Sequence, residues 1–98
     1  MAKYNLSNVA KEDLIRIHHY GVKQFGIKQA DKYFNSFFMH FERIAEHPHS
    51  FESVDFIKPG YRRCVCGVDS IFYKMNDDVV EIMTIIGRQD LNQLIMSY

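Results

Sequence analysis

The sequence GYRRCVCGVDSIFYKMNDDVVEIMTIIGRQD, residues 60–90, decides the fold. It contains three short runs rich in the aromatic and β-branched residues that favour strands, at residues 61–66, 70–75 and 79–86. The segment Asn76-Asp77-Asp78 is typical of a turn, because Asn and Asp tolerate positive φ and bond their own backbone. Strands joined by such short turns are antiparallel, since a parallel return takes about a dozen residues. The run at 79–86 is the most apolar, and we expect it to be the central strand.

Two helices are predicted before this sheet. A short first strand is expected at residues 3–6, and Ser7 is a suitable N-cap for a helix whose apolar residues recur at helical spacing. Gly26 is expected to end that helix in the αL conformation. A second helix is predicted from about Lys28 until Pro48 stops it. Because the connection is short, the two helices form an antiparallel hairpin, whose apolar face must cover the sheet.

The sequence therefore predicts an α+β fold, with an N-terminal strand and an antiparallel helical hairpin packed on a small antiparallel β-sheet. Residues 49–59 are expected to form a loop with one brief strand at 54–57, and residues 91–98 either a turn on the sheet edge or a partner-binding tail. One point stays open. Glu81 and Thr84 lie at positions of opposite parity in the last strand, so either a bulge or a two-sided environment is required.

Length and composition restrict the class of protein. A chain of 98 residues has the size of one domain with a single core, so we expect one domain over residues 1–98. No apolar run reaches the roughly 18 residues of a membrane span, and the N-terminus lacks the pattern of a secretory signal. We expect a cytoplasmic protein with no membrane partner. The formal net charge of zero counts against nucleic acid as the dominant partner, although a local basic patch is compatible with it.

No local motif predicts catalysis or a bound metal. Cys64 and Cys66 are expected to be small buried hydrophobic residues rather than a disulfide or metal ligands. His18 and His19 are adjacent on a helix and point about 100° apart, so they cannot hold one metal ion. The other histidines flank a helix end, where capping and solvated surface explain them. We therefore expect no catalytic residue, no metal and no cofactor.

Two groups of residues are candidates for binding surfaces. The second predicted helix carries an aromatic stripe that is mainly core but too wide for one contact surface, so part of it is expected to dock a partner segment. This docking surface is assigned to Tyr33, Phe34, Phe37 and Phe41. Arginines at the strand ends either pair with Asp77, Asp78 or Asp90, or form a cationic patch. A target-facing surface is assigned to Arg62, Arg63, Arg88, Asp90, Leu94 and Tyr98.

Several motifs in order along the chain resemble the ParE toxins of the RelE/ParE superfamily. They are GYRR at 60–63, IFYK at 71–74 and the apolar strand that closes on IIGRQD at 85–90, preceded by YNLSNVAKEDLIRI at 4–17 and FGIKQADKYF at 25–34. The resemblance thus covers residues 4–90. It implies the toxin of a type II toxin–antitoxin pair, neutralised by a ParD-like antitoxin. The aromatic stripe is then the surface on which we expect this antitoxin to dock.

The resemblance also implies a mechanism. RelE-like relatives cut messenger RNA on the ribosome, and such an endoribonuclease would use Arg62, Arg63, Arg88 and Tyr73 of this chain. However, Thr84 stands where relatives often have Arg, and residues 87–90 contain no histidine where many relatives have one. The favoured function is therefore that of the ParE branch, binding DNA gyrase and trapping its cleaved DNA complex, without enzymatic activity or sequence-specific DNA binding by the toxin alone. The alternatives are the ribosome-dependent endoribonuclease and a decayed toxin retained as an interaction module.

Overall fold

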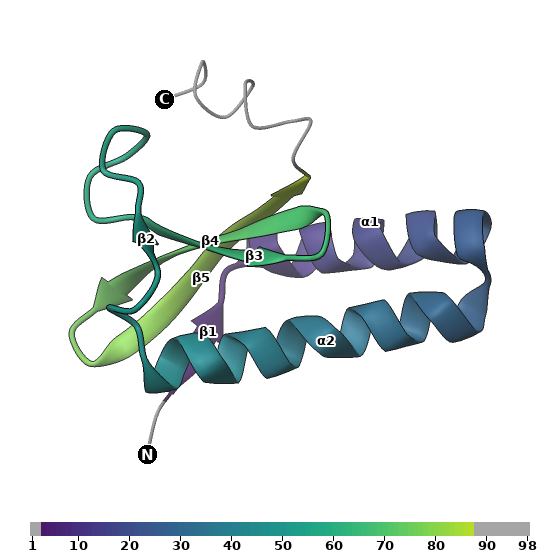
Figure 1. Cartoon of the computed structure of the whole chain (residues 1–98), viewed down its shortest axis with the longest axis horizontal. Coiled ribbons are helices and arrows are strands. Elements are labelled where there is room, and N and C mark those ends of the chain that lie inside the picture. The colour runs from purple at the N-terminus through teal and green to yellow at the C-terminus, as the bar shows by residue number, and fades with distance from the viewer. Residues whose placement is uncertain (1–2, 88–98) are drawn as a thin grey trace.

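The computed structural model describes residues 3–87, and Figure 1 shows how they are arranged. One strand and two long helices are followed by four strands. These elements are β1 (Tyr4–Leu6), α1 (Asn8–Phe25), α2 (Ile27–Glu46), β2 (Glu52–Ser53), β3 (Arg62–Cys66), β4 (Asp69–Asn76) and β5 (Val79–Gly87). The predicted α+β class and the order of strand, helical hairpin and sheet are confirmed.

The five strands form one sheet in the order β1-β5-β4-β3-β2. Strands β3, β4 and β5 are antiparallel neighbours, as predicted. Strand β1, however, pairs parallel to β5, with Tyr4 opposite Val80, so the sheet is mixed rather than antiparallel throughout. The parallel pairing is possible because the two helices supply the long return that it needs. Strand β5 is interior, as expected, but the middle strand of the sheet is β4.

The brief strand predicted at residues 54–57 is wrong in position. Strand β2 comprises Glu52–Ser53 and ends before Val54. The chain then turns, with the amides of Ile57 and Lys58 donating to the carbonyl of Val54. The side chain of Val54 is fully buried against Phe72, so the chain bends around an anchored residue instead of continuing as a strand.

The ends of the helices follow from capping and from one glycine. The hydroxyl of Ser7 accepts a hydrogen bond from the amide of Ala10 at 3.0 Å, so the predicted N-cap of α1 is confirmed. Gly26 has the expected positive φ of 88°, but its ψ of 163° lies outside αL. Helix α2 begins at Ile27, one residue earlier than predicted, so this single glycine has to reverse the chain by itself.

Helices α1 and α2 cover one face of the sheet, and the main core lies between the helices and the sheet (Figure 1). The helices contribute Ala10, Leu14, Ile17, Phe37, Phe41 and Ile44. The sheet contributes Cys64, Cys66, Ile71, Tyr73, Val80, Ile82 and Ile85. Every second residue of β3 and β4 therefore faces the helices, as the pleat of a strand requires.

A bulge in β5 answers the question of which face meets the helices. Ile82 lies opposite Tyr73, but Thr84 lies opposite Phe72, so Met83 is an extra residue with no partner in the ladder. The extra residue brings Ile82 and Ile85, three positions apart, onto the same buried face. Glu81 and Thr84 then share the other side of the strand, which is the bulge alternative left open by the sequence.

The turn between β4 and β5 also agrees with the sequence. Asn76 pairs with Val79, which leaves Asp77 and Asp78 as the two turn residues. Asp77 has a φ of 56°, a left-handed conformation that Asp tolerates better than most side chains. The second face of the sheet carries a smaller buried cluster of Val54 and Phe72, packed against Ile57, Tyr61 and Ile86.

Candidate functional site

The two described arginines of the predicted target-facing surface do not lie together. Arg62 and Arg63 are neighbours on β3, so their side chains leave opposite faces of the sheet. Nη1 of Arg62 donates to the carbonyl of Phe51 at 2.7 Å. Nε and Nη2 of Arg63 donate to the same Glu52 carboxylate oxygen at 3.0 and 2.7 Å. The two arginines therefore make separate internal contacts and not one cationic patch.

The partner of Arg63 differs from those considered in the sequence. The acidic residues considered were Asp77, Asp78 and Asp90, whereas the structure pairs Arg63 with Glu52 because β2 aligns these two residues directly. The remaining residues of the predicted target-facing surface are Arg88, Asp90, Leu94 and Tyr98. They lie outside the described residues, together with the tail at 91–98, so their assignment stays a prediction.

Tyr73, the tyrosine that a ribonuclease would use, is fully buried. Its hydroxyl donates to the carbonyl of Pro48 at 2.6 Å. Burial raises the pKa of Tyr73 to about 12, and the nearby positive charge of Arg62 only partly opposes this effect. A hydroxyl that is enclosed, committed to a carbonyl and hard to ionise is poorly suited to proton transfer with an external substrate.

Half of the predicted docking surface belongs to the core. Phe37 and Phe41 have no exposed area, which disagrees with their predicted place on a partner-binding surface. They pack against sheet residues of the same chain. Tyr33 and Phe34 are only partly buried. The aromatic stripe is wide because α2 packs against two neighbours. One side of the helix covers the sheet, and another side contacts α1.

Tyr33 fixes α2 to the hairpin formed by β3 and β4. Its hydroxyl lies 2.8 Å from the carbonyl of Cys66 and 2.7 Å from a carboxylate oxygen of Asp69, so it donates to either acceptor. Burial, followed by the bond to Asp69, raises the pKa of Tyr33. The tyrosine ring also fills the space beside Gly67, where an added Cβ would lie 2.7 Å from the ring.

A cleft of about 480 Å³ between α1 and α2 was not predicted. It is lined by Ile15, His18, His19, Asp31, Phe34 and Asn35. Nε2 of His18 lies 2.7 Å from a carboxylate oxygen of Asp31, and its ring meets Phe34 edge-on. The signal in the sequence was the short connection, because an antiparallel hairpin closing at Gly26 places residues 18 and 31 at similar heights.

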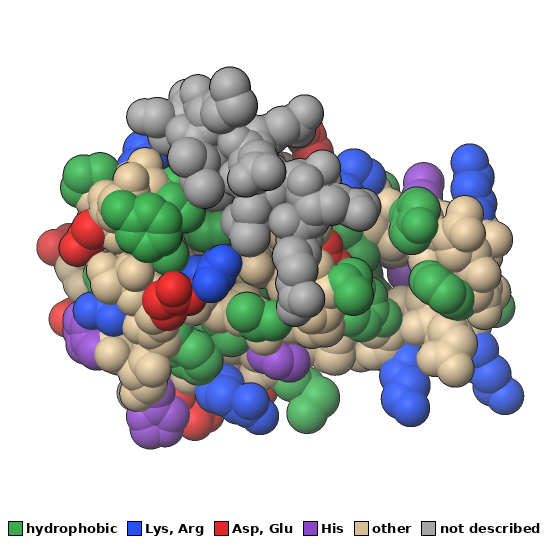
Figure 2. Space-filling model, turned by 45° about the horizontal axis from the view of Figure 1, so that its top comes forward, with side chains coloured by type: hydrophobic (Ala, Val, Ile, Leu, Met, Phe, Trp, Pro, Cys, Tyr) green, Lys and Arg blue, Asp and Glu red, His purple; other side chains and the backbone are tan. Residues whose placement is uncertain are grey.

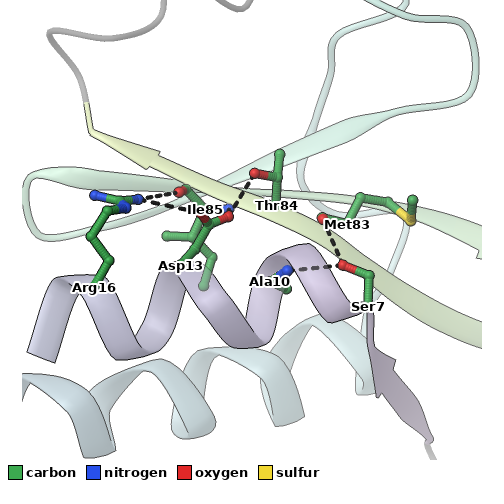
Figure 3. Close-up of polar contacts among 7 residues, drawn as sticks. All are labelled: Ser7, Ala10, Asp13, Arg16, Met83, Thr84 and Ile85. Carbon is green, nitrogen blue, oxygen red and sulfur yellow. Dashed lines mark hydrogen bonds and ion pairs between the residues drawn. The ribbon is translucent and has the colours of Figure 1, made fainter.

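Side chains of α1 and of its N-cap Ser7 cover the part of the β5 edge that β1 does not reach (Figure 3). The hydroxyl of Ser7 donates to the carbonyl of Met83, and the carboxylate of Asp13 accepts from the hydroxyl of Thr84 and the amide of Ile85. Nη2 of Arg16 lies 3.3 Å from the carbonyl of Ile85. Thr84 therefore contributes to holding the edge of the sheet.

Within residues 3–87, no three side chains of His, Cys, Asp or Glu are arranged to hold a metal ion. Cys64 and Cys66 are buried free thiols, and burial raises the pKa of both. Neither helix in the described part of the chain has the length and apolar character of a membrane span.

The fold and these surfaces can be compared with known proteins. The family model described as "ParE toxin of type II toxin-antitoxin system, parDE" matches residues 4–91. The chain belongs to the ParE toxin family. It is 36% identical over 92 residues to Toxin ParE1 of Caulobacter vibrioides, with 94% of each chain covered. It is 29% identical over 86 residues to Toxin ParE1 of Mycobacterium tuberculosis, with 84% of this chain and 88% of that protein covered.

Solved structures support the same fold for this ParE toxin. The structure titled "Chromosomal ParDE TA system from P. aeruginosa" has a TM-score of 0.78 at 17% identity, covering 89% of this chain and 96% of that one. A toxin from Helicobacter pylori has a TM-score of 0.56 at 19% identity, covering 93% and 99%. The chain is therefore a ParE toxin of a type II toxin–antitoxin system with the fold that its resemblance predicted.

Proposed function

We propose that this ParE toxin acts by binding DNA gyrase and trapping its cleaved DNA complex, and that a ParD-like antitoxin neutralises it. The observation that carries this proposal is the family match, which spans nearly the whole chain. A mechanism based on binding requires an accessible surface, and it does not require groups that transfer protons.

The internal contacts of the described residues favour binding over RNA cleavage. An endoribonuclease needs accessible cations for the phosphate and an accessible group for proton transfer. In this chain Tyr73 is buried and its hydroxyl is bonded to the carbonyl of Pro48. Arg62 is bonded to a backbone carbonyl and Arg63 to Glu52. Using any of them on an RNA substrate would require breaking contacts within the fold.

The antitoxin is proposed to dock across Tyr33 and Phe34. These two residues of the aromatic stripe retain exposed surface, and Phe34 lines the cleft between α1 and α2 beside the exposed side chain of Ile15. A cleft on a helical hairpin that combines apolar Ile15 and Phe34 with polar side chains suits an amphipathic segment, which inserts its own apolar residues between the helices.

The gyrase proposal is tested with purified toxin in supercoiling and DNA-cleavage assays. We expect loss of supercoiling and accumulation of cleaved DNA when the complex is denatured. Toxin that stops growth while both gyrase activities remain unchanged would contradict the proposal. In that case, codon-positioned cuts in cellular messenger RNA, detected by primer extension and lost in Arg62→Ala, would support the endoribonuclease instead. Expression without any growth defect would support a decayed toxin.

The antitoxin proposal is tested by co-expression with the product of the neighbouring reading frame. We expect a complex that survives gel filtration and that Phe34→Asp weakens without loss of the circular dichroism spectrum of the toxin. Phe56→Asp is the matched control, because Phe56 is 76% exposed and lies in the loop between β2 and β3. Equal weakening by both variants would remove the cleft from the antitoxin-binding surface.

A further inference from the structure

The joined end of α1 and α2 projects beyond the sheet (Figure 1). Three large apolar side chains are exposed there, with Tyr20 at 62%, Phe25 at 69% and Ile27 at 59%. Phe25 and Ile27 flank the glycine at which the chain reverses. Single exposed apolar residues are ordinary, but three of them gathered at a projecting end indicate an interaction surface.

Three lysines accompany these apolar residues. Lys23 lies in the last turn of α1, and Lys28 and Lys32 lie one turn apart on the same face of α2. All three are exposed, and none takes part in the ion pairs found within residues 3–87. Figure 2 shows Lys and Arg side chains along both borders of this end, hydrophobic side chains between them, and no acidic side chain in that part of the view. We call the set the apex: Tyr20, Lys23, Phe25, Ile27, Lys28 and Lys32.

Although the formal net charge of the chain is zero, its positive and negative residues are unevenly distributed along the sequence. Residues 14–41 contain four Lys and Arg residues but one Asp or Glu, a formal charge of +3, so the remaining residues carry −3. The single acidic residue, Asp31, is paired with His18. Residues 14–41, and not the two complete helices, are therefore the positive part of a neutral chain, and the apex lies within this range.

We propose that the apex binds the phosphate backbone of DNA without sequence preference. Lysines neutralise phosphates and release condensed counterions, which supplies most of the free energy of non-specific DNA binding. Aromatic and apolar side chains between the lysines pack on sugars and on unstacked bases, an arrangement found in proteins that hold nucleic acid without reading its sequence. A solvated helix face explains exposed lysines, but it does not explain three exposed apolar residues among them.

The cellular setting of this contact rests on the proposed function, since DNA is part of the gyrase complex that the toxin would trap. Three phosphate contacts support only weak binding, comparable with or weaker than the roughly 10⁻⁴–10⁻⁶ M typical of non-specific complexes. The apex therefore adds to a complex that gyrase already holds, because DNA bound beside the toxin is present at high effective concentration. The contact with the backbone is independent of sequence, so it agrees with the expected lack of sequence-specific DNA binding.

The test measures binding of the full chain to a short labelled DNA duplex by fluorescence anisotropy at several salt concentrations. We expect the logarithm of the association constant to fall with the logarithm of salt concentration with a slope of about −3. The double variant Lys28→Glu/Lys32→Glu is expected to lose about tenfold or more in affinity at low salt and to flatten this slope. Phe25→Ser is expected to lower the affinity while the slope is unchanged.

The matched control is Lys3→Glu/Lys11→Glu, which makes the same change in net charge at exposed lysines away from the apex. It is expected to bind far better than the apex variant. Equal losses in the two double variants, or no salt-dependent binding by the unmodified chain, would overturn the proposal. Binding to phosphatidylserine vesicles in preference to DNA would overturn it in favour of a membrane surface.

The outcomes also separate this inference from the gyrase proposal. If the unmodified toxin binds DNA through the apex but leaves gyrase supercoiling and cleavage untouched, the proposed function fails and the apex inference stands. If gyrase is inhibited but the two double variants bind DNA equally well, the apex inference fails and the proposed function stands.

Discussion

The base and the apex of the helical hairpin carry similar side chains in opposite environments. At the base, which is the part that covers the sheet, Leu14, Phe37 and Phe41 are at most 3% exposed. At the apex, Phe25 is 69% and Ile27 is 59% exposed. Both sets belong to long helices with apolar residues at helical spacing, so the difference comes from where the sheet ends and not from the helices themselves.

This difference shows that one hairpin performs two tasks. The base contributes hydrophobic free energy to the fold, because each buried aromatic side chain removes a large apolar area from water. The exposed apolar residues of the apex contribute little to the stability of the fold. Burying them against a partner would therefore add hydrophobic free energy to binding. Measuring the free energy of unfolding after substitutions at the base and at the apex therefore tests whether only the base stabilises the fold.

The largest contrast is expected for Phe41→Ala and Phe25→Ala. Removing the ring of Phe41 leaves a cavity in the core, and we expect a loss of about 3–5 kcal/mol in the free energy of unfolding. Removing the exposed ring of Phe25 is expected to change it by about 0.5 kcal/mol or less. Urea denaturation followed by circular dichroism measures both. Similar losses in the two variants would show that the apex contributes to the fold as the base does.

The next contrast concerns pH and Tyr73 at the base. Its pKa is raised from 10.0 to about 12 by burial, so above pH 10 the unfolded chain releases a proton that the folded chain keeps. The stability is therefore fully present below pH 10 and falls as the pH rises towards 12, by about 2–3 kcal/mol in total. Urea titrations at alkaline pH measure this loss.

The control for this alkaline loss is Tyr73→Phe. This variant lacks the hydrogen bond to Pro48 and starts from a lower stability, but its share of the alkaline loss should be absent. Tyr33 and Cys64, whose pKa values burial also raises, contribute a loss of the same sign in both proteins. An identical pH dependence in the two proteins would show that Tyr73 is accessible to water.

Much of the fold was predictable because its signals are local. The three antiparallel strands, the cap at Ser7 and the turn at Asp77 depend on residues within a few positions of each other. The parallel pairing of β1 with β5 was missed because its partners lie more than 70 residues apart, and no local pattern encodes that contact. The bulge at Met83 was one of two options, and only the ladder with β4 decides between them.

The candidate surfaces were less predictable than the fold. The alternation of side chains along a strand already places Arg62 and Arg63 on opposite faces, so this error was avoidable. The burial of Phe37 and Phe41 was not decidable from helical spacing, because that spacing marks an apolar face and not how far the sheet extends beneath it. For the same reason, nothing in the pattern singled out Phe25 and Ile27 as exposed.

A smaller effect is expected at the border between base and apex, where Tyr33 packs on Gly67. An added Cβ at Gly67 would lie 2.7 Å from the ring, and its φ of 59° also favours glycine. Gly60 is the matched control, because its φ is 84° but no atom lies within 4 Å of an added Cβ. We expect Gly67→Ala to cost about 1–2 kcal/mol more than Gly60→Ala in urea denaturation. Equal costs would mean that Tyr33 moves aside freely and does not fix α2 to the β3–β4 hairpin.

The smallest effect is expected for the pair of His18 and Asp31, which joins the two helices between base and apex. Their side chains are 25% and 58% exposed, so water competes for the contact despite its length of 2.7 Å. A double-mutant cycle of His18→Ala, Asp31→Ala and both is expected to give a coupling of less than about 1 kcal/mol. A coupling near 2 kcal/mol would mean that the helices are held together as firmly here as over the sheet. The part of the hairpin that stabilises the fold would then extend further towards Gly26.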